Sequence, residues 1–179
     1  MQISTYAQGD VESGVLVSRT HPFLLISLRD PGESVALPPA PACVGVLTIE
    51  CRDHEMGTSA SGGFLPAHAQ QIVYAVTCLP PTVEEIVVHC QAGISRSPAV
   101  AAALAHLFGV DDTPFLSFPK YPNRQIYRTL CAALSRTYAQ ENRERLHGEQ
   151  PSQTITPWEL TMDTTVSREE PPVWRSLTL

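Results

Sequence analysis

Three short apolar runs constrain the fold of this chain most. They span residues 23–28 (FLLISL), 44–49 (VGVLTI) and 85–90 (EIVVHC). The first two are continuously apolar, which is typical of strands that are covered on both faces, and the third is short and rich in β-branched residues. Residues 30–42, between the first two runs, are rich in proline and indicate a loop. We also expect a weaker strand at residues 2–5.

Helical patterns alternate with these strands. Residues 68–79 have apolar side chains at helical spacing, residues 97–108 are rich in Ala and Leu and stop at Gly109, and a last helix runs from about 123 to about 146. Strands that alternate with helices predict a parallel sheet with right-handed crossovers. We therefore expect an α/β fold, a three-layer sandwich in which helices flank a mostly parallel central sheet of four to five strands.

The chain divides in the sequence into a domain and a tail. Residues 1–147 contain all the periodic segments, and we predict that they form one domain. Residues 148–179 are rich in Pro, Ser and Thr and show no sustained period, which is typical of a flexible C-terminal tail. Trp158 and Trp174 leave a docking segment open as the alternative for this tail.

Charge and composition narrow the classes of partner. The net charge of −6 argues against nucleic acid or an anionic membrane as the main partner. The polar first ten residues lack the pattern of a signal peptide, and no stretch approaches the roughly 20 apolar residues that a membrane span needs. Five cysteines without a CxxC pair favour free thiols in a reducing, cytoplasmic setting. We expect a monomer.

The string VVHCQAGISRSPAV, from residue 87 onward, follows a strand and opens a helix. A loop in this position directs several backbone N–H groups at one point, and the helix dipole adds to their pull on an anion. Gly93 permits a tight turn and a close approach of the backbone to an oxyanion. Arg96 supplies a planar guanidinium that binds two phosphate oxygens at once. The string therefore predicts a phosphate site.

Cys90 stands at the mouth of this site. A free thiol has a pKa near ~8.5, and a helix N-terminus with a nearby cation lowers it to roughly 3.5–7.5. We expect the same here, so that Cys90 is a nucleophile for phosphorus. Ser97 is placed to donate a hydrogen bond to the sulfur, and we expect His89 to orient the loop through a hydrogen bond from its ring.

A family resemblance extends this interpretation. HCQAGISRS resembles the His-Cys-x5-Arg-Ser/Thr signature of the protein tyrosine phosphatase superfamily, and SPAVAAAL is similar to its small bacterial dual-specificity members. LLISLRDPG, VLTIECRDH and YPNRQIYRTL resemble flanking segments, so the likeness covers roughly residues 1–146. It implies a phosphotyrosine protein phosphatase-like fold and hydrolysis of protein phosphotyrosine, with phosphoserine and phosphothreonine as further substrates. It also implies a phosphocysteine on Cys90 and no metal or other cofactor. The phosphate-binding residues would be Gln91, Ala92, Gly93, Ile94, Ser95 and Arg96.

The family mechanism also needs a general acid, and Asp53 is our candidate. It follows the strand that ends near residue 49, and Cys90 ends another strand. Because catalytic groups gather at the carboxyl edge of an open α/β sheet, the two residues are expected to meet there. A helix cap or loop carboxylate is the structural alternative for Asp53. Other acidic residues remain as rival acids: Glu50, Glu55, Asp111 and Asp112.

Several alternatives stay open at this point. The same scaffold serves lipid and RNA phosphatases, although QAGIS lacks the extra basic residues that such enzymes often have. A catalytically inactive phosphate-binding module and a redox sensor that pairs Cys51 with Cys90 are further possibilities. Arg52 either contacts substrate or is a solvated charge. Asn123 is expected to cap the last helix. The remaining cysteines are expected in the core: Cys43, Cys78 and Cys131.

Overall fold

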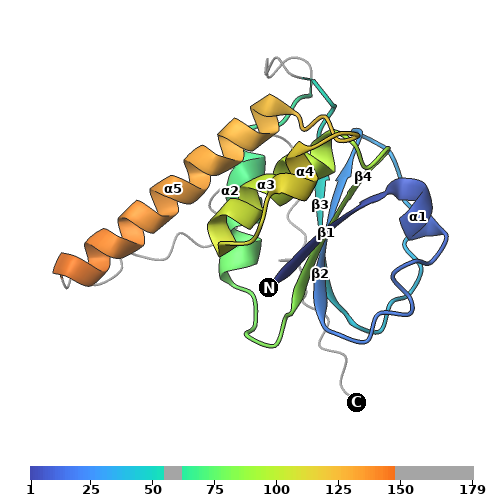
Figure 1. Cartoon of the computed structure of the whole chain (residues 1–179), viewed down its shortest axis with the longest axis horizontal. Coiled ribbons are helices and arrows are strands. Elements are labelled where there is room, and N and C mark those ends of the chain that lie inside the picture. Colours follow the sequence, from blue (N-terminus) through green and yellow to red (C-terminus); the bar gives the residue numbers. More distant parts are fainter. Residues whose placement is uncertain (55–61, 148–179) are drawn as a thin grey trace, which may run out of the picture. The chain divides into compact units, whose positions relative to one another are not determined.

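A four-stranded sheet, in which every neighbouring pair is parallel, organises the protein (Figure 1). The computed structural model describes residues 1–54 and 62–147. The strands are β1 (Gln2–Ala7), β2 (Phe23–Arg29), β3 (Cys43–Glu50) and β4 (Glu85–Cys90), in the order β1-β4-β2-β3. The three predicted strands are confirmed, and the weak one extends to Ala7.

Position in the sheet decides how deeply each strand is buried. All six residues of the inner strand β4 are buried, as expected for a strand with neighbours on both sides. The run at residues 44–49 was expected to be covered on both faces, and that expectation is wrong. It lies in β3, an edge strand, where Val44 is 42% and Val46 48% exposed. Its alternating exposure is that of a strand with one open face.

The three predicted helices are present. They are α2 (Pro66–Thr77), α3 (Arg96–Phe108) and α5 (Arg124–His147). Pro66 occupies the first turn of α2, where a missing N–H does no harm. Gly109 ends α3 with a left-handed φ of 64°, which glycine adopts without strain. The short helices α1 (Gln8–Glu12) and α4 (Thr113–Leu116) were not predicted, because four or five residues are too few to show a helical period.

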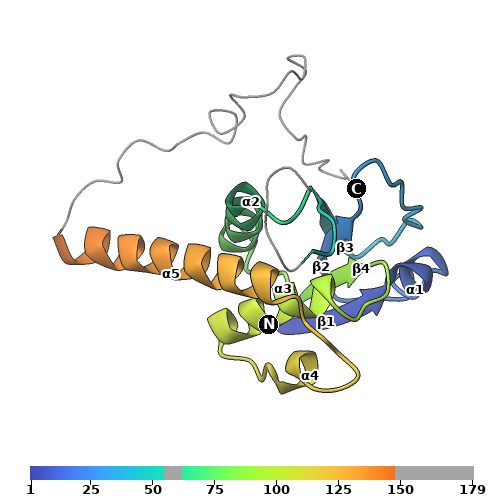
Figure 2. The ribbon, with the colours of Figure 1, turned by 90° about the horizontal axis from the view of Figure 1, so that it is seen from above.

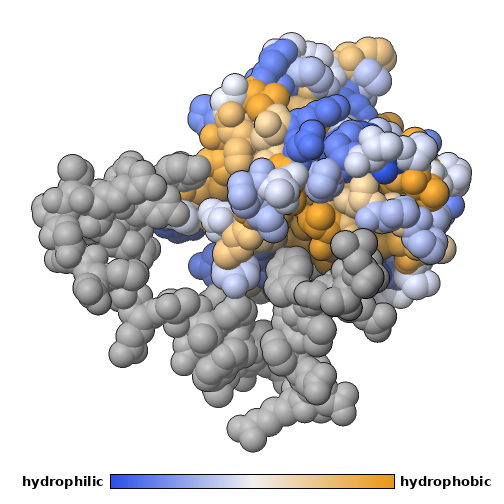
Figure 3. Space-filling model, turned by 90° about the horizontal axis from the view of Figure 1, so that it is seen from below, coloured by the Kyte–Doolittle hydropathy of each residue, from blue (hydrophilic) through white to orange (hydrophobic). Residues whose placement is uncertain are grey.

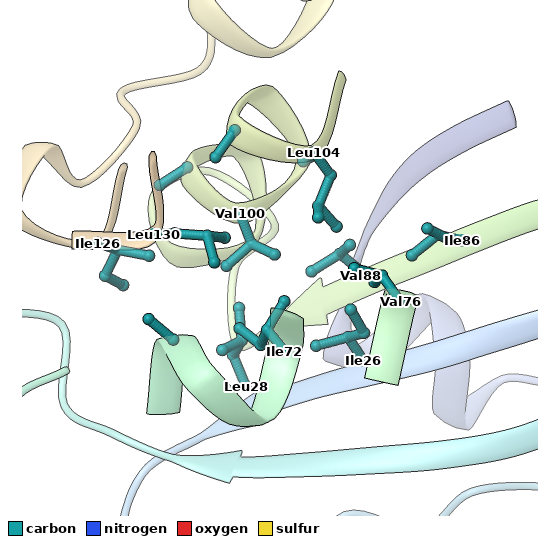
Figure 4. Close-up of a cluster of buried hydrophobic side chains, with 14 of the residues drawn as sticks. Ile26, Leu28, Ile72, Val76, Ile86, Val88, Val100, Leu104, Ile126 and Leu130 are labelled. Atoms are coloured by element: carbon teal, nitrogen blue, oxygen red, sulfur yellow. The ribbon is translucent and has the colours of Figure 1, made fainter. Parts of the chain in front are cut away.

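The larger core lies between one face of the sheet and the helices α2, α3 and α5 (Figures 1 and 4). Every residue from Arg96 to Ala105 is buried, so this part of α3 is enclosed on all sides. Its run of alanines lets the neighbouring elements pack closely against it. The side chains labelled in Figure 4 fill this core: Ile26, Leu28, Ile72, Val76, Ile86, Val88, Val100, Leu104, Ile126 and Leu130.

The second face of the sheet has a thinner cover. Phe23, Leu25 and Val87 pack there against Val11 of α1 and Leu16. The only helix on this face of the described residues is the five-residue α1, and irregular segments supply the rest of the cover (Figure 2). The predicted α/β sandwich is therefore confirmed, with an unequal distribution of helices between its faces.

Residues Met1–Thr137 form a compact unit that contains all four strands. The predicted tail at 148–179 and the alternative acid Glu55 lie outside the described residues. Viewed from below, the described surface carries hydrophilic and hydrophobic residues side by side (Figure 3). Among the helices that the structure describes, none combines the length and the apolar character needed to cross a bilayer.

Candidate active site

The segment between β4 and α3 forms a tight loop at the carboxyl edge of the sheet. Cys90 ends β4 and Arg96 begins α3, and each is only 2% exposed. Gly93, between them, has a φ of +67°. A Cβ atom there would lie 2.8 Å from the Ala7 nitrogen and 3.0 Å from the Tyr6 oxygen. The glycine is thus required by a close approach of the loop to β1, in addition to the turn that the sequence predicted.

The nucleophile candidate contacts the predicted hydroxyl. Cys90 Sγ lies 3.2 Å from Ser97 Oγ, within the buried first turn of α3. A hydroxyl in this place can donate a hydrogen bond to the sulfur and stabilise negative charge on it. The structure thus brings these two residues together as the sequence analysis expected.

The protein anchors the guanidinium of Arg96 through one nitrogen and leaves another without a partner in the described residues. Its Nη1 donates to the carbonyl oxygen of Cys51 at 2.7 Å and to Asp30 Oδ1 at 2.9 Å. Its Nε is buried and has no hydrogen-bond partner among the described residues. Buried donors are nearly always paired, so an orphaned N–H on a guanidinium needs an explanation. An oxyanion in the adjoining pocket would supply the missing acceptor.

Asp30, the partner of Arg96, was not identified from the sequence. It begins the tight turn Asp30-Pro31-Gly32-Glu33 that follows β2. The Glu33 N–H donates to the Asp30 carbonyl at 3.0 Å, and Gly32 has a φ of +78°. Proline followed by glycine at the centre of a turn is typical of type II. This turn, placed at the carboxyl end of an inner strand, was the available signal for a residue at the site.

Asp53 lies beside the loop, as predicted for the candidate acid. Its Oδ1 accepts hydrogen bonds from Ser95 Oγ at 2.9 Å and from Asn123 Nδ2 at 2.8 Å. Both bonds are made to the same oxygen, and no described residue bonds to Oδ2. The carboxylate is thus held against the phosphate loop despite its distance along the chain.

Asn123 has a second role that the sequence did not reveal. Its Oδ1 accepts from the Ile126 N–H at 3.1 Å, which confirms the predicted cap of α5. Its Nδ2 donates to Asp53 and, at 3.2 Å, to the carbonyl oxygen of His54. One fully buried amide therefore joins the start of α5 to the segment that carries the candidate acid.

A pocket of about 640 Å³ opens between these groups. Cys90, Arg96 and Asp53 line it, and so does every residue of the loop except Gly93. The structure adds four residues from the segments that follow β2 and β3: Asp30, Pro31, Arg52 and His54. Glu50, Asp111 and Asp112 are not among the lining residues, so the geometry favours Asp53 over these rivals.

Among the described residues, His89 does not make the hydrogen bond that the sequence analysis expected. His89 is fully buried, yet neither ring nitrogen has a hydrogen-bond partner in residues 1–54 and 62–147. Burial lowers the pKa of the imidazole to about 4, and the positive charge of Arg96 adds to this effect. The ring is therefore neutral at pH 7, and it contributes to the loop through packing.

Cys51 lies directly after β3 and is fully buried. Burial raises the pKa of its thiol to about 12, although the charge of Arg96 acts in the opposite direction. A thiol that remains protonated at pH 7 is a poor partner for disulfide exchange. This finding favours a structural role for Cys51 over the redox alternative.

The other cysteines are less buried than expected. Cys78 is exposed, and the prediction that it lies in the core is wrong, because it follows the last turn of α2. Cys43 and Cys131 are partly buried, and burial raises the pKa of both thiols. In the part of the chain that the structure describes, no three His, Cys, Asp or Glu residues form a group able to hold a metal ion.

Comparison with known proteins shows the fold. No family model matches the sequence, and no curated protein matches it. The structure of human DUSP28 aligns with a TM-score of 0.55 and 19% identity, over 77% of this chain and 94% of its own. A mouse protein assigned to the dual specificity phosphatases, complexed with zinc tungstate, aligns with a TM-score of 0.54 and 19% identity, over 76% of this chain and 84% of its own. The chain has the fold of the dual specificity phosphatases.

Proposed function

We propose that this protein hydrolyses phosphate monoesters through a phosphocysteine on Cys90, with protein phosphotyrosine as the first substrate to test. One observation carries the proposal. A buried guanidinium lines the same pocket as a buried thiol, and it is anchored through Nη1 while its Nε has no partner in the described residues. An anion with several oxygens can accept the hydrogen bond from such a donor. The sulfur of Cys90, in the same pocket, can then attack the phosphorus of a bound phosphate ester.

The first chemical step forms a phosphorus–sulfur bond. Cys90 Sγ attacks phosphorus as a thiolate, and the bond from phosphorus to the ester oxygen breaks. Arg96 and the loop amides bind the remaining phosphoryl oxygens, whose charge rises in the transition state. Asp53 gives its proton to the departing oxygen, so that an alcohol or phenol leaves.

The second step returns the enzyme to its starting state. Water attacks phosphorus, Asp53 takes one of its protons, and the phosphorus–sulfur bond breaks. Ser97, 3.2 Å from the sulfur, donates a hydrogen bond to the leaving thiolate. The products are inorganic phosphate and the free thiolate, and the positive charge that the reaction needs comes from Arg96 and the helix N-terminus.

Hydrolysis of para-nitrophenyl phosphate tests the proposal. The wild type should turn over this ester, and Cys90→Ser should not. Cys78→Ser is the matched control, because Cys78 is an exposed thiol that does not line the pocket. Tungstate, the oxyanion in the mouse complex, should bind to the wild type and protect Cys90 from iodoacetamide. Equal turnover by wild type and Cys90→Ser would refute the proposal, and tungstate binding without turnover would indicate an inactive phosphate-binding module.

A pH–rate profile tests the acid separately. The leaving oxygen needs a proton from Asp53, so the wild-type rate should fall as that carboxyl group ionises. Asp53→Asn should lose this basic limb and keep affinity for tungstate, since the substitution leaves Cys90 and Arg96 in place. If Asp53→Asn behaves like the wild type, the acid assignment is wrong while the phosphatase proposal stands.

A further inference from the structure

The segment that joins α4 to α5 can be followed in Figure 2, and it carries two aromatic side chains that are exposed to solvent. Phe118 is 83% exposed and Tyr121 is 65% exposed. Their rings meet edge to face, with centroids 6.2 Å apart. A single exposed apolar residue needs no explanation. Two aromatic rings in contact form an apolar surface, and its burial by a partner is energetically favourable.

This segment is fastened to the phosphate loop. The Tyr121 N–H donates to the Ile94 carbonyl at 3.0 Å, and the Asn123 N–H donates to the Ser95 carbonyl at 3.2 Å. The Lys120 ammonium donates to the Gly93 carbonyl at 2.5 Å. The backbone that carries the two rings is therefore placed relative to the candidate active site before any ligand arrives, which lowers the entropy lost on binding.

Ile94 connects the rings to the pocket. It lines the pocket, it is 39% exposed, and its carbonyl holds the Tyr121 backbone. The backbone bond joins Ile94, at the pocket, to Tyr121, and the ring of Tyr121 contacts the ring of Phe118; we name these three residues the apolar rim. Arg52 and His54, which flank Asp53 in the segment after β3, line a second border of the same pocket.

The apolar rim begins at the pocket with Ile94 and lies beside it. A phosphate group bound to Arg96 is still bonded to the rest of the substrate. That remainder must extend out of the pocket past one of its borders. An extended peptide advances about 3.3 Å per residue, so side chains within three positions of the phosphorylated residue reach about 10 Å from it. The rim begins at the pocket and continues through two adjacent aromatic rings, which places it within this reach.

We propose that the apolar rim selects phosphopeptide substrates that carry a large apolar side chain within three residues of the phosphorylated residue. The proposal rests on the proposed phosphatase function and adds a substrate preference to it. A peptide fits better than an anionic membrane lipid, because the protein has a net charge of −6. A small ester such as para-nitrophenyl phosphate does not extend to Phe118.

Phosphotyrosine peptides with one variable position test the proposal. Each peptide has a serine and glycine background and carries either Leu or Asp at one position from −3 to +3. At one or more positions the wild type should hydrolyse the Leu peptide with about tenfold higher kcat/KM than the Asp peptide, which corresponds to about 1.4 kcal/mol. The double variant Phe118→Ser, Tyr121→Ser should reduce this ratio to within twofold and leave para-nitrophenyl phosphate hydrolysis unchanged.

Two further variants make the result specific. Tyr74→Ser removes another exposed tyrosine, on α2 and away from the pocket lining, and should keep the tenfold preference. Phe118→Lys should reverse the preference toward the Asp peptide at the same position, because it replaces an apolar contact with a cation. A wild type that hydrolyses para-nitrophenyl phosphate but treats all peptides alike would overturn the rim proposal and leave the phosphatase function intact.

Two other outcomes also decide the matter. If neither the small ester nor any peptide is hydrolysed, the proposed function fails and the rim proposal fails with it. If sedimentation shows a self-associated wild type and a monomeric double variant, with no peptide preference in either, the rim is a contact between copies of the chain and the substrate proposal is wrong.

Discussion

Buried charged side chains at the two edges of the sheet differ in how completely the protein satisfies their hydrogen bonds. At the amino edge Glu85 is fully buried, and its carboxylate accepts from Ser4 Oγ at 2.5 Å and from Arg19 Nη1 at 2.6 Å. His21 Nε2 lies 2.6 Å from the same carboxylate, and Arg19 also bonds to the Tyr6 hydroxyl. At the carboxyl edge Arg96 is as deeply buried, but its Nε has no partner in the described residues.

The difference separates a structural cluster from a ligand site. A buried charge whose hydrogen bonds are all made by the protein has nothing left to offer a ligand. A buried charge that the protein anchors on one side only is prepared for an acceptor from outside. On this basis Glu85 should contribute to stability, and Arg96 should contribute to catalysis.

Replacement of the anchored cation should have the largest effect. Arg96→Lys keeps the charge but loses the planar pair of donors, so kcat/KM for para-nitrophenyl phosphate should fall by about 10³-fold, or about 4 kcal/mol. The urea midpoint should move far less than this loss implies. A variant that keeps wild-type kcat/KM would remove the distinction between the two edges.

Removal of the amino-edge carboxylate should give the converse result. Glu85→Leu leaves Arg19 and His21 without their anion, and the free energy of unfolding should fall by roughly 3–4 kcal/mol. Below the melting transition, KM for para-nitrophenyl phosphate should stay unchanged, because the cluster is at the far end of β4. Chemical denaturation followed by circular dichroism checks the stability, and Glu84→Leu, an exposed neighbour, is the control.

Acid should destabilise the fold through His89. The pKa of His89 is about 4 in the folded protein against an ordinary 6.5, so as pH falls the unfolded chain binds the proton first. The stability due to the neutral ring is complete above pH 6.5 and is lost between pH 6.5 and 4, by about 3 kcal/mol. Urea midpoints across this range should show the loss in the wild type. His89→Gln cannot titrate there, so an identical pH dependence in that variant would contradict the prediction.

The smallest effect is expected at Asp30. Asp30→Ala removes one of the two acceptors that hold Arg96 Nη1, and kcat/KM should fall about fivefold, or about 1 kcal/mol, since Asp30 is partly solvated. Asp30→Asn keeps an acceptor and should recover most of the rate. If Asp30→Ala raises the affinity for tungstate, the carboxylate acts mainly by repelling anions, and the anchor interpretation is wrong.

The sequence predicted the parts of the site that are local in the chain. Cys90, Arg96 and Ser97 lie within eight consecutive residues that fix their own geometry, so a strand, a turn and a helix start were enough to place them. The strands were also found from local signals, because the runs that form β2 and β3 are continuously apolar and the run that forms β4 is rich in β-branched residues.

The sequence predicted that Asp53 lies near the loop, but it did not predict the individual bonds between distant segments. The bond from Arg96 to Asp30 and the bond from Asn123 to Asp53 join residues that are 66 and 70 positions apart. No periodicity records such a pairing, since it depends on how the loops after three strands fold over one sheet edge. The unpaired ring of His89 was missed for a related reason, because the sequence gives the residue and its strand but not its neighbours.

The contact at Gly93 reaches as far as the beginning of the chain. Tyr6 and Ala7 lean on the loop at a spot where only a hydrogen atom fits, and the Gln8 N–H donates to the Gln91 carbonyl at 3.1 Å. The loop thus packs directly against β1. Removal of the first residues, or fusion of a bulky tag directly to them, would therefore disturb the position of Cys90 Sγ, although no residue of the pocket had been changed.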